Sequence, residues 1–150
     1  MKAVIQRVTK ASVEVENKKI SEINIGLVIL LGITQDDNQE DVEWLANKIV
    51  NLRIFDDEEG IMNKSIIEIN GEILTVSQFT LLARTKKGNR PSYIEAANSD
   101  KANVMYEEFI KKIELNLKKK TKKGKFQTHM KVELINDGPV TIIIDTKDKK

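Results

Sequence analysis

Two polar segments interrupt apolar stretches of the chain, and their residue types are suited to binding or catalysis. In the first, Ser77, Gln78 and Thr80 follow the apolar run 73–76. A buried hydroxyl or amide without a hydrogen-bond partner costs roughly 1–3 kcal/mol. Three polar residues at this point therefore predict a strand end that opens into a pocket. A half-exposed strand edge is the alternative, and the residue types alone favour that alternative.

The second segment runs from Asn136 to Pro139, between two apolar stretches. A proline can open a strand because the first position can lack a ladder donor. The glycine before it has access to unusual backbone torsions, and an X-Pro bond can be cis. A hairpin turn between two strands is the simpler interpretation, and residue types alone favour it.

Familiar catalytic groups are scarce in this chain. His129 is the only histidine, and there is no cysteine. A Ser-His-Asp triad would need His129 as its base, yet no nucleophile elbow is present. Zinc needs several His, Cys or carboxylate ligands, which the sequence does not supply. We therefore expect no metal or cofactor, and a structural or surface role for His129.

Charge is nearly balanced overall but uneven along the chain. The net charge is +2, which excludes a globally basic nucleic-acid binder. Residues 111–125 hold eight lysines against one glutamate, and a second cluster contains Arg84, Lys86, Lys87 and Arg90. Such patches can engage phosphates, although solvated surfaces are the more common role of lysine runs.

The length of 150 residues fits one domain, 1–150, with a flexible tail expected over 147–150. No signal-peptide pattern opens the chain, and the longest apolar run, 27–33, is far shorter than the ~20 residues of a membrane span. We expect a soluble cytoplasmic protein without membrane contact.

Period-two alternation predicts strands over 4–8, 11–15, 20–25 and 130–134. The continuous apolar run over 27–33 predicts a strand buried on both faces, and the last strand, over 140–144, is expected to be buried in the same way. A strand over 72–79 follows the Asn70-Gly71 turn, and a short strand is expected over 53–55.

Two helices complete the predicted elements. Apolar residues at 42, 45, 46 and 49 predict the first, capped by Asn38 or Asp36. Apolar residues at 102, 105, 109 and 113 predict the second, capped by Ser99 or Asp100. Strands dominate and are mostly sequential. The fold class is therefore a single compact α+β domain with a mixed or antiparallel, barrel-like sheet and two main helices.

Ser77-Gln78-Phe79-Thr80-Leu81 and Asn136-Asp137-Gly138-Pro139-Val140-Thr141 together resemble the two signature motifs of the D-aminoacyl-tRNA deacylase family. The resemblance is colinear over essentially the whole chain, including residues 1–8, 26–33, 51–55, 62–65, 86–91 and 124–126.

This resemblance implies a homodimer that hydrolyses the ester between a D-amino acid and the 3'-terminal adenosine of tRNA, with mischarged glycyl-tRNA as a related substrate. It implies that Gly138-Pro139 is cis and enters the pocket of the other subunit, where its carbonyls reject L-amino acids. Arg7 would hold this segment in place, with Asn136 as a further supporting residue. An outward surface charge is the alternative for Arg7. The partner is aminoacylated tRNA, and no DNA is expected.

The same resemblance places Ser77, Gln78, Phe79 and Thr80 around the scissile ester. Main-chain N–H groups of Gln78 and Phe79 would form an oxyanion hole. Thr80 would position the substrate, with a nucleophilic role as the minority alternative, while the 2'-hydroxyl of the adenosine helps to activate water. Phe126 and Met130 match positions around the adenine, and Ala102 matches a small helix residue near it; core packing is the alternative for these three. Residues 127–129 depart from the small residues usual in the family.

Overall fold

One long strand, β1 (Lys2–Val15), organises the sheet in the computed structural model, which describes residues 1–149. Its first half pairs antiparallel with β3 (Gly26–Gly32), and its second half with β2 (Lys18–Ile23). Its other edge pairs antiparallel with β8 (Lys131–Asp145). The two strands predicted over 4–8 and 11–15 are therefore one. Thr9 and Lys10 break the alternation because both are exposed, beside an irregularity in the pairing with β8.

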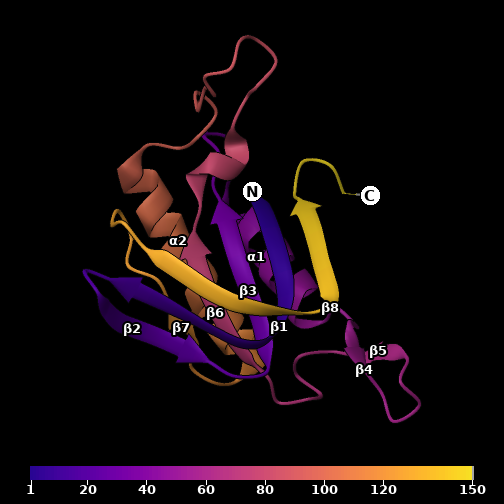
Figure 1. Cartoon of the computed structure of the whole chain (residues 1–150). Coiled ribbons are helices and arrows are strands. Elements are labelled where there is room, and N and C mark those ends of the chain that lie inside the picture. Colours follow the sequence, from indigo (N-terminus) through magenta and orange to yellow (C-terminus); the bar gives the residue numbers. More distant parts are fainter. Residues whose placement is uncertain (150) are drawn as a thin grey trace.

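Parallel pairing extends the sheet on the other side of β3. The neighbour of β3 is β6 (Glu72–Ser77), and β7 (Lys122–Lys123) pairs parallel with β6. The order is β2-β1-β3-β6-β7, with β8 beside β1, so the sheet is mixed and curls into a nearly closed, barrel-like shape (Figure 1). A separate hairpin joins β4 (Phe55–Asp56) to β5 (Met62–Lys64). Sequence patterns did not predict β5 or β7, because such short strands show no alternation.

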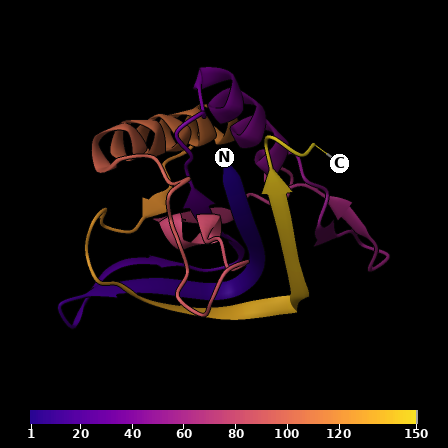
Figure 2. The same ribbon diagram turned by 90° about the horizontal axis from the view of Figure 1, so that it is seen from above.

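Two helices cover one face of the sheet (Figure 2). Helix α1 (Gln39–Val50) begins after Asn38, whose side chain accepts hydrogen bonds from the N–H groups of Glu40 and Asp41, which confirms the predicted cap. Helix α2 (Ser99–Leu117) begins one residue earlier than expected. Its cap is Asn98, which accepts from the N–H of Lys101 at 2.9 Å, so the prediction of Ser99 or Asp100 was wrong.

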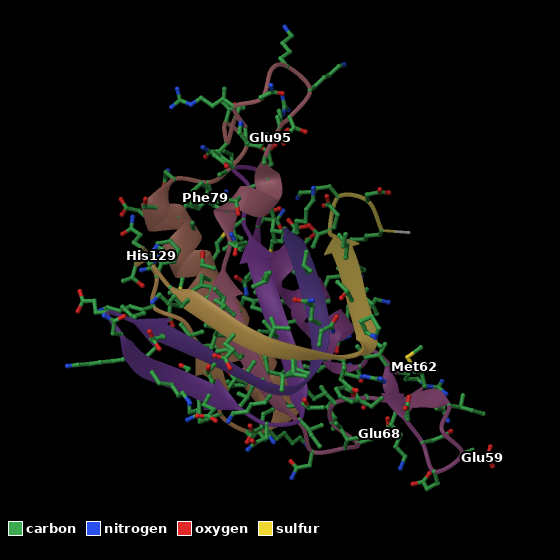
Figure 3. All side chains as sticks on the ribbon, viewed as in Figure 1. Glu59, Met62, Glu68, Phe79, Glu95 and His129 are labelled. Carbon is green, nitrogen blue, oxygen red and sulfur yellow. The ribbon has the colours of Figure 1, made fainter. Side chains whose placement is uncertain are left out.

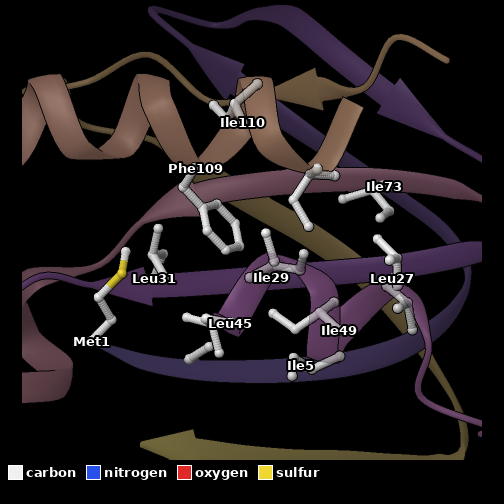
Figure 4. Close-up of a cluster of buried hydrophobic side chains, with 14 of the residues drawn as sticks. Met1, Ile5, Leu27, Ile29, Leu31, Leu45, Ile49, Ile73, Phe109 and Ile110 are labelled. Atoms are coloured by element: carbon white, nitrogen blue, oxygen red, sulfur yellow. The ribbon is translucent and has the colours of Figure 1, made fainter. Parts of the chain in front are cut away.

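The main core lies between the helices and the sheet (Figure 4). Phe109 and Ile110 of α2 and Leu45 and Ile49 of α1 meet apolar side chains of β1, β3 and β6 there. A second, smaller core fills the curl of the sheet. It consists of Val8, Ala11, Val13, Val15, Ile23, Val28, Leu74 and Val76.

Two predicted strands differ from the observed ones. The strand expected over 72–79 ends at Ser77, and Phe79–Leu82 forms a short 3-10 helix, η1. The run 140–144 was expected to be buried on both faces, and that prediction was wrong. Ile142 and Ile144 pack against the core, but Ile143 points outward and is 70% exposed. It belongs to β8, which continues through Gly138-Pro139 without the predicted hairpin turn.

The C-terminal residues return to the start of α1. The Lys147 ammonium lies 2.8 Å from the Asp41 carboxylate, and Lys149 lies over the Trp44 ring. Flexibility over 147–150 stays a prediction, and residue 150 lies outside the described residues. Within residues 1–149, no helix is long and apolar enough to cross a membrane.

Candidate active site

A pocket of about 460 Å³ opens where β3 and β6 end and α2 begins. Figure 3 shows Phe79 and His129 at this end of the molecule, on the opposite side from Met62 and Glu68. The pocket brings together six of the predicted site residues: Ser77, Gln78, Phe79, Ala102, Phe126 and Met130. The end of β6 and the start of η1 form one wall of the pocket, and the segment that precedes β8 forms another.

Phe126 is held in the pocket by buried neighbours. Its ring lies 6.0 Å from that of Tyr106, whose hydroxyl donates to the Thr75 carbonyl at 2.8 Å. Burial raises the pKa of the Tyr106 phenol, so this group stays a donor at every physiological pH. Gly124 packs so closely that a Cβ there would lie 2.6 Å from the Met130 sulfur. Phe126 is thereby fixed against α2 with part of its ring facing the cavity.

Main-chain geometry corrects one expectation for the segment 77–80. The N–H of Gln78 donates to the Leu31 carbonyl at 2.7 Å, so it is not free to serve an oxyanion hole. Phe79 and Thr80 open the 3-10 helix η1, where the first N–H groups have no intrahelical acceptor. The candidate donors are therefore these two N–H groups. The side-chain amide of Gln78 donates to the Thr80 hydroxyl, and Thr80 does not line the pocket.

Gly138 and Pro139 lie away from this pocket, in a bulge of β8. Val8 pairs with Asn136 and Gln6 with Thr141, so the four residues 137–140 lie opposite Arg7 alone. The Gly138-Pro139 bond is cis, as the resemblance implied. Gly138 has φ +120°, and a Cβ there would lie 2.8 Å from Val140 and 3.2 Å from the Arg7 guanidinium. Only glycine fits this backbone and this space.

Arg7 is buried, with 7% of its surface exposed, so the alternative of an outward surface charge was wrong. Its Nε donates to the Asp137 carbonyl at 3.3 Å and lies 3.2 Å from the Asp137 carboxylate. Its Nη1 donates to the Ile54 carbonyl at 2.8 Å and pairs with Asp56. Arg7 thus ties the residue before Gly138 to the β4 region.

The Asn136 side chain stabilises the bulge by hydrogen bonds to the main chain on both sides of it. Its amide nitrogen donates to the carbonyls of Arg7 and Val140, each at 3.0 Å, and its oxygen accepts from the Thr141 hydroxyl at 3.3 Å. One side chain therefore bridges both ends of the segment 137–139. Gly138 and Pro139 themselves are exposed, on a base held by Arg7 and Asn136.

Residues 4–145 match the sequence profile of the D-Tyr-tRNA(Tyr) deacylase family. The chain belongs to this family. It is 57% identical over its full length to the D-aminoacyl-tRNA deacylase of Flavobacterium psychrophilum and 60% identical to that of Cytophaga hutchinsonii, and all of each relative is covered. These deacylases are hydrolases, which agrees with the activity expected from the two motifs.

Two solved structures resemble the fold of this deacylase family member. A protein titled c-Myc DNA Unwinding Element Binding Protein superposes with a TM-score of 0.93 at 43% identity, over 97% of this chain and 99% of that one. A probable eukaryotic D-amino acid tRNA deacylase superposes with a TM-score of 0.83 at 15% identity, over 95% and 97% of the two chains. The second likeness supports the fold alone.

Among residues 1–149, no carboxylate, lysine or arginine side chain lines the pocket of this deacylase. Its one ionisable side chain is His129, which is exposed at the rim. Within the same residues, no group of three or more His, Cys, Asp or Glu side chains is arranged to hold a metal ion. The polar residues of the lining are Ser77, Gln78, Ser99, Gln127, Thr128 and His129.

Sequence reasoning missed several lining residues of the deacylase pocket. Ala96 and Ala97 precede α2 in a loop with no periodic signal, and the backbone of Gln127 adopts a left-handed conformation with φ 57°. Small residues in an irregular loop carry no pattern from which a pocket wall could be inferred. The exposed position of His129 agrees with its predicted surface role, although it also contributes to the rim.

Proposed function

We propose that this protein hydrolyses the ester between a D-amino acid and the 3'-terminal adenosine of tRNA, with glycyl-tRNA as a related substrate. It does so as a homodimer whose two active sites each combine the pocket of one subunit with Gly138-Pro139 of the other. Membership of the deacylase family supports the reaction, and the uncharged pocket supports a mechanism based on main-chain groups.

The separation of Gly138-Pro139 from the pocket within one chain carries this proposal. Arg7, opposite these two residues, pairs with Leu27 of β3, whereas Leu31 of the same strand lines the pocket. Four residues along a strand span roughly 13 Å. Gly138 and Pro139 are exposed and are not among the residues that line the pocket, so we infer that a second copy supplies the pocket that they complete.

An exposed apolar face of β8 gives this second copy a place to bind. Ile135 is 58% exposed and Ile143 is 70% exposed, one on each side of the Gly138-Pro139 bulge. We take these two side chains, with Pro139 between them, as part of the interface, since contiguous exposed apolar patches mark interaction sites. A two-fold dimer uses the same patch on both subunits, which brings each bulge to the partner.

Selectivity follows from a wall made of main chain. Carbonyl groups of Gly138 and Pro139 face the α-amino group of the substrate, and an L side chain collides with them. A D side chain points to solvent, so its identity matters little. Arg7 and Asn136 fix the wall through the hydrogen bonds to Asp137 and Val140.

Hydrolysis uses the N–H groups at the start of η1. The N–H of Phe79, which lines the pocket, holds the carbonyl oxygen of the ester as negative charge develops. Thr80 is a positioning group, since Gln78 engages its hydroxyl. The 2'-hydroxyl of the adenosine helps to activate water, and Phe126, Met130 and Ala102 hold the base, with Ser77 beside the ester.

Complementation between two inactive variants tests the shared site. Ala102→Trp fills the pocket, and Gly138→Ala disturbs the wall, so each homodimer loses hydrolysis of D-tyrosyl-tRNA. Random exchange of subunits makes about half of the dimers mixed, each with one intact site, so about a quarter of wild-type activity returns. Val104→Trp, on the exposed face of the same helix, is the control. No recovery in mixtures shown to contain mixed dimers would contradict the shared site.

A nucleic-acid-binding module without catalysis is the second candidate, favoured by the similar structure titled as a DNA unwinding element binding protein. Release of tyrosine from D-tyrosyl-tRNA and L-tyrosyl-tRNA separates the two. Loss of the D ester alone supports the deacylase, equal loss indicates an unselective esterase, and no loss leaves the binding module.

A further inference from the structure

A basic hairpin projects from the pocket end of the molecule, between η1 and α2 (Figure 1). Arg84 and Ser92 close it, because each N–H donates to the other's carbonyl, at 2.8 and 3.0 Å. The tip, residues 85–91, contains Lys86, Lys87 and Arg90, all exposed, and no acidic residue. Arg84 is different, since Glu95 pairs with it. Three cations are therefore held together without an internal counter-charge.

Two exposed aromatic rings connect this hairpin to the pocket. Phe79 lines the pocket, and its ring meets that of Tyr93 edge to face at 5.1 Å. Phe79 is 56% exposed, although large aromatic side chains usually bury most of their surface, and Tyr93 is 37% exposed. The order from the cavity outward is therefore pocket, aromatic pair and basic tip.

Three further lysines, Lys118 to Lys120, lie at the far end of the domain. Lys118 follows α2, and the 15 steps from Ala102 to Leu117 span roughly 22 Å of helix. Lys119 donates to the Asn70 carbonyl at 3.0 Å, beside the start of β6, whereas the other end of β6 reaches the pocket at Ser77. Lys120 pairs with Glu114. The helix length and the strand position both show that Lys118, Lys119 and Lys120 are remote from the pocket.

We propose that residues 85–93 hold the unpaired RNA strand that leads into the pocket. Tyr93 stacks on a base next to the terminal nucleotide, and Lys86, Lys87 and Arg90 contact the phosphates. Stacking suits any base, because every base has a π face, and it requires an exposed ring beside the cavity. Phosphate contacts require cations without internal partners. This inference rests on the proposed function, since it takes the substrate to be a tRNA.

The salt dependence of D-tyrosyl-tRNA hydrolysis tests whether the cations of residues 85–93 contact the RNA phosphates. In the variant K86Q/K87Q/R90Q we expect KM to rise about 10-fold or more with kcat retained. The slope of log(kcat/KM) against log salt falls by about 2, since each phosphate contact on a single strand contributes about 0.7. The control K118Q/K119Q/K120Q changes the three lysines of the remote end and keeps the wild-type slope. Equal slopes in the two variants overturn the proposal.

The aromatic contact has its own test. Tyr93→Ala raises KM roughly 5- to 30-fold through lost stacking, and Tyr93→Phe restores it, because the ring suffices. Binding of uncharged tRNA, measured by fluorescence anisotropy, separates this inference from the deacylase proposal. If the wild type binds tRNA without hydrolysing the ester, the deacylase proposal is refuted, but the variants still test RNA binding by residues 85–93. If tRNA binding is the same in wild type, K86Q/K87Q/R90Q and Tyr93→Ala, RNA binding by residues 85–93 is refuted whatever the activity.

Discussion

The two ends of the central sheet are built in opposite ways. At one end, β3, β6 and α2 enclose a pocket whose lining, among residues 1–149, contains no carboxylate, lysine or arginine side chain. At the other, Arg7, Asp56 and Asp137 form a charged cluster beneath Gly138 and Pro139, which are exposed. The pocket is a cavity without a selective wall, and the bulge is a rigid wall without a cavity.

This difference shows how one small domain can provide both parts of a stereoselective site. A rigid wall needs dense hydrogen bonding, which Arg7 and Asn136 supply from buried or half-buried positions. A pocket for an ester needs unoccupied donors and open space. Because the two parts lie at separate ends, the charged cluster is not beside the pocket, and in the proposed dimer the two parts come together.

The largest effect is expected from breaking the association of the two ends. Ile143→Glu places a charge in the proposed interface, where an unpaired charge costs several kcal/mol, so the dissociation constant of the dimer rises by roughly 100-fold or more. Hydrolysis of D-tyrosyl-tRNA falls with it. Analytical ultracentrifugation measures the dimer, and Leu115→Glu, at 68% exposure on α2, is the control. Equal association in both variants would place the interface elsewhere.

Loss of Arg7 tests the wall alone. Arg7→Ala leaves the buried Ile54 carbonyl without its donor and frees Asp137, so we expect the free energy of unfolding to fall by about 2–3 kcal/mol. We expect the D-ester rate to fall about tenfold and the preference for D over L to narrow, because a mobile wall excludes less. Denaturant unfolding and paired D and L assays measure both.

Lys10→Ala is the matched control for Arg7→Ala on the same strand. Lys10 is about half exposed and pairs with Glu22, and such surface pairs contribute about 0–1 kcal/mol. Lower stability with unchanged selectivity in Arg7→Ala would show that the arginine supports the fold but not the wall.

Local signals made part of this molecule predictable from sequence. Asn38 caps α1 as expected, and Met105, Phe109, Ile113 and Leu117 form the buried stripe of α2. A cap and a helical stripe depend on neighbours within a few residues, so the sequence contains all that is needed. The same holds for β3, whose continuous apolar run is buried between two neighbouring strands.

Long-range partners made the rest unpredictable. The run Phe79–Leu82 has the composition of a strand, but it forms η1 because β6 ends at Ser77. Burial of Arg7 depends on Ile54 and Asp56, some fifty residues away. Ile143 has the residue type of a core position, but it is 70% exposed, because the pairing of β8 with β1 decides which face of the strand it occupies. Family resemblance, not periodicity, pointed to Gly138-Pro139.

The ion pair between Asp41 and Lys147 lies away from both the pocket and the bulge, so changing it should alter stability but not the selectivity between D and L esters. Burial raises the pKa of Asp41, but hydrogen bonds from Lys147, Thr146 and the Asn38 N–H outweigh it and lower the pKa to about 2. Because the folded pKa is depressed, the stabilisation is present above the unfolded value of about 3.9 and is lost as pH falls from about 4 to 2. Asp41→Asn should therefore lower the free energy of unfolding by about 2 kcal/mol at pH 7 and not at pH 2.

Selectivity between D and L esters should be unchanged in Asp41→Asn at pH 7, since Asp41 lies beside the chain termini and not at the pocket or the bulge. Unfolding followed across the pH range gives the first quantity, and paired ester assays give the second. A stability difference that persists at pH 2 would indicate that the carboxylate acts through packing and not through its charge.

The smallest effect is expected at His129, the one ionisable side chain of the pocket lining among the described residues. It is exposed at the rim, in the segment that precedes β8. If catalysis uses main-chain N–H groups and the substrate's own hydroxyl, His129→Gln changes kcat less than about 3-fold, far below the 10²–10⁴-fold contribution of a general base. Rates measured from pH 5 to 8 provide the test, because a catalytic imidazole gives an inflection in that range that glutamine removes. An inflection that is present in the wild type and absent in His129→Gln would give this pocket a side-chain base, and the contrast between an uncharged pocket and a charged wall would no longer hold.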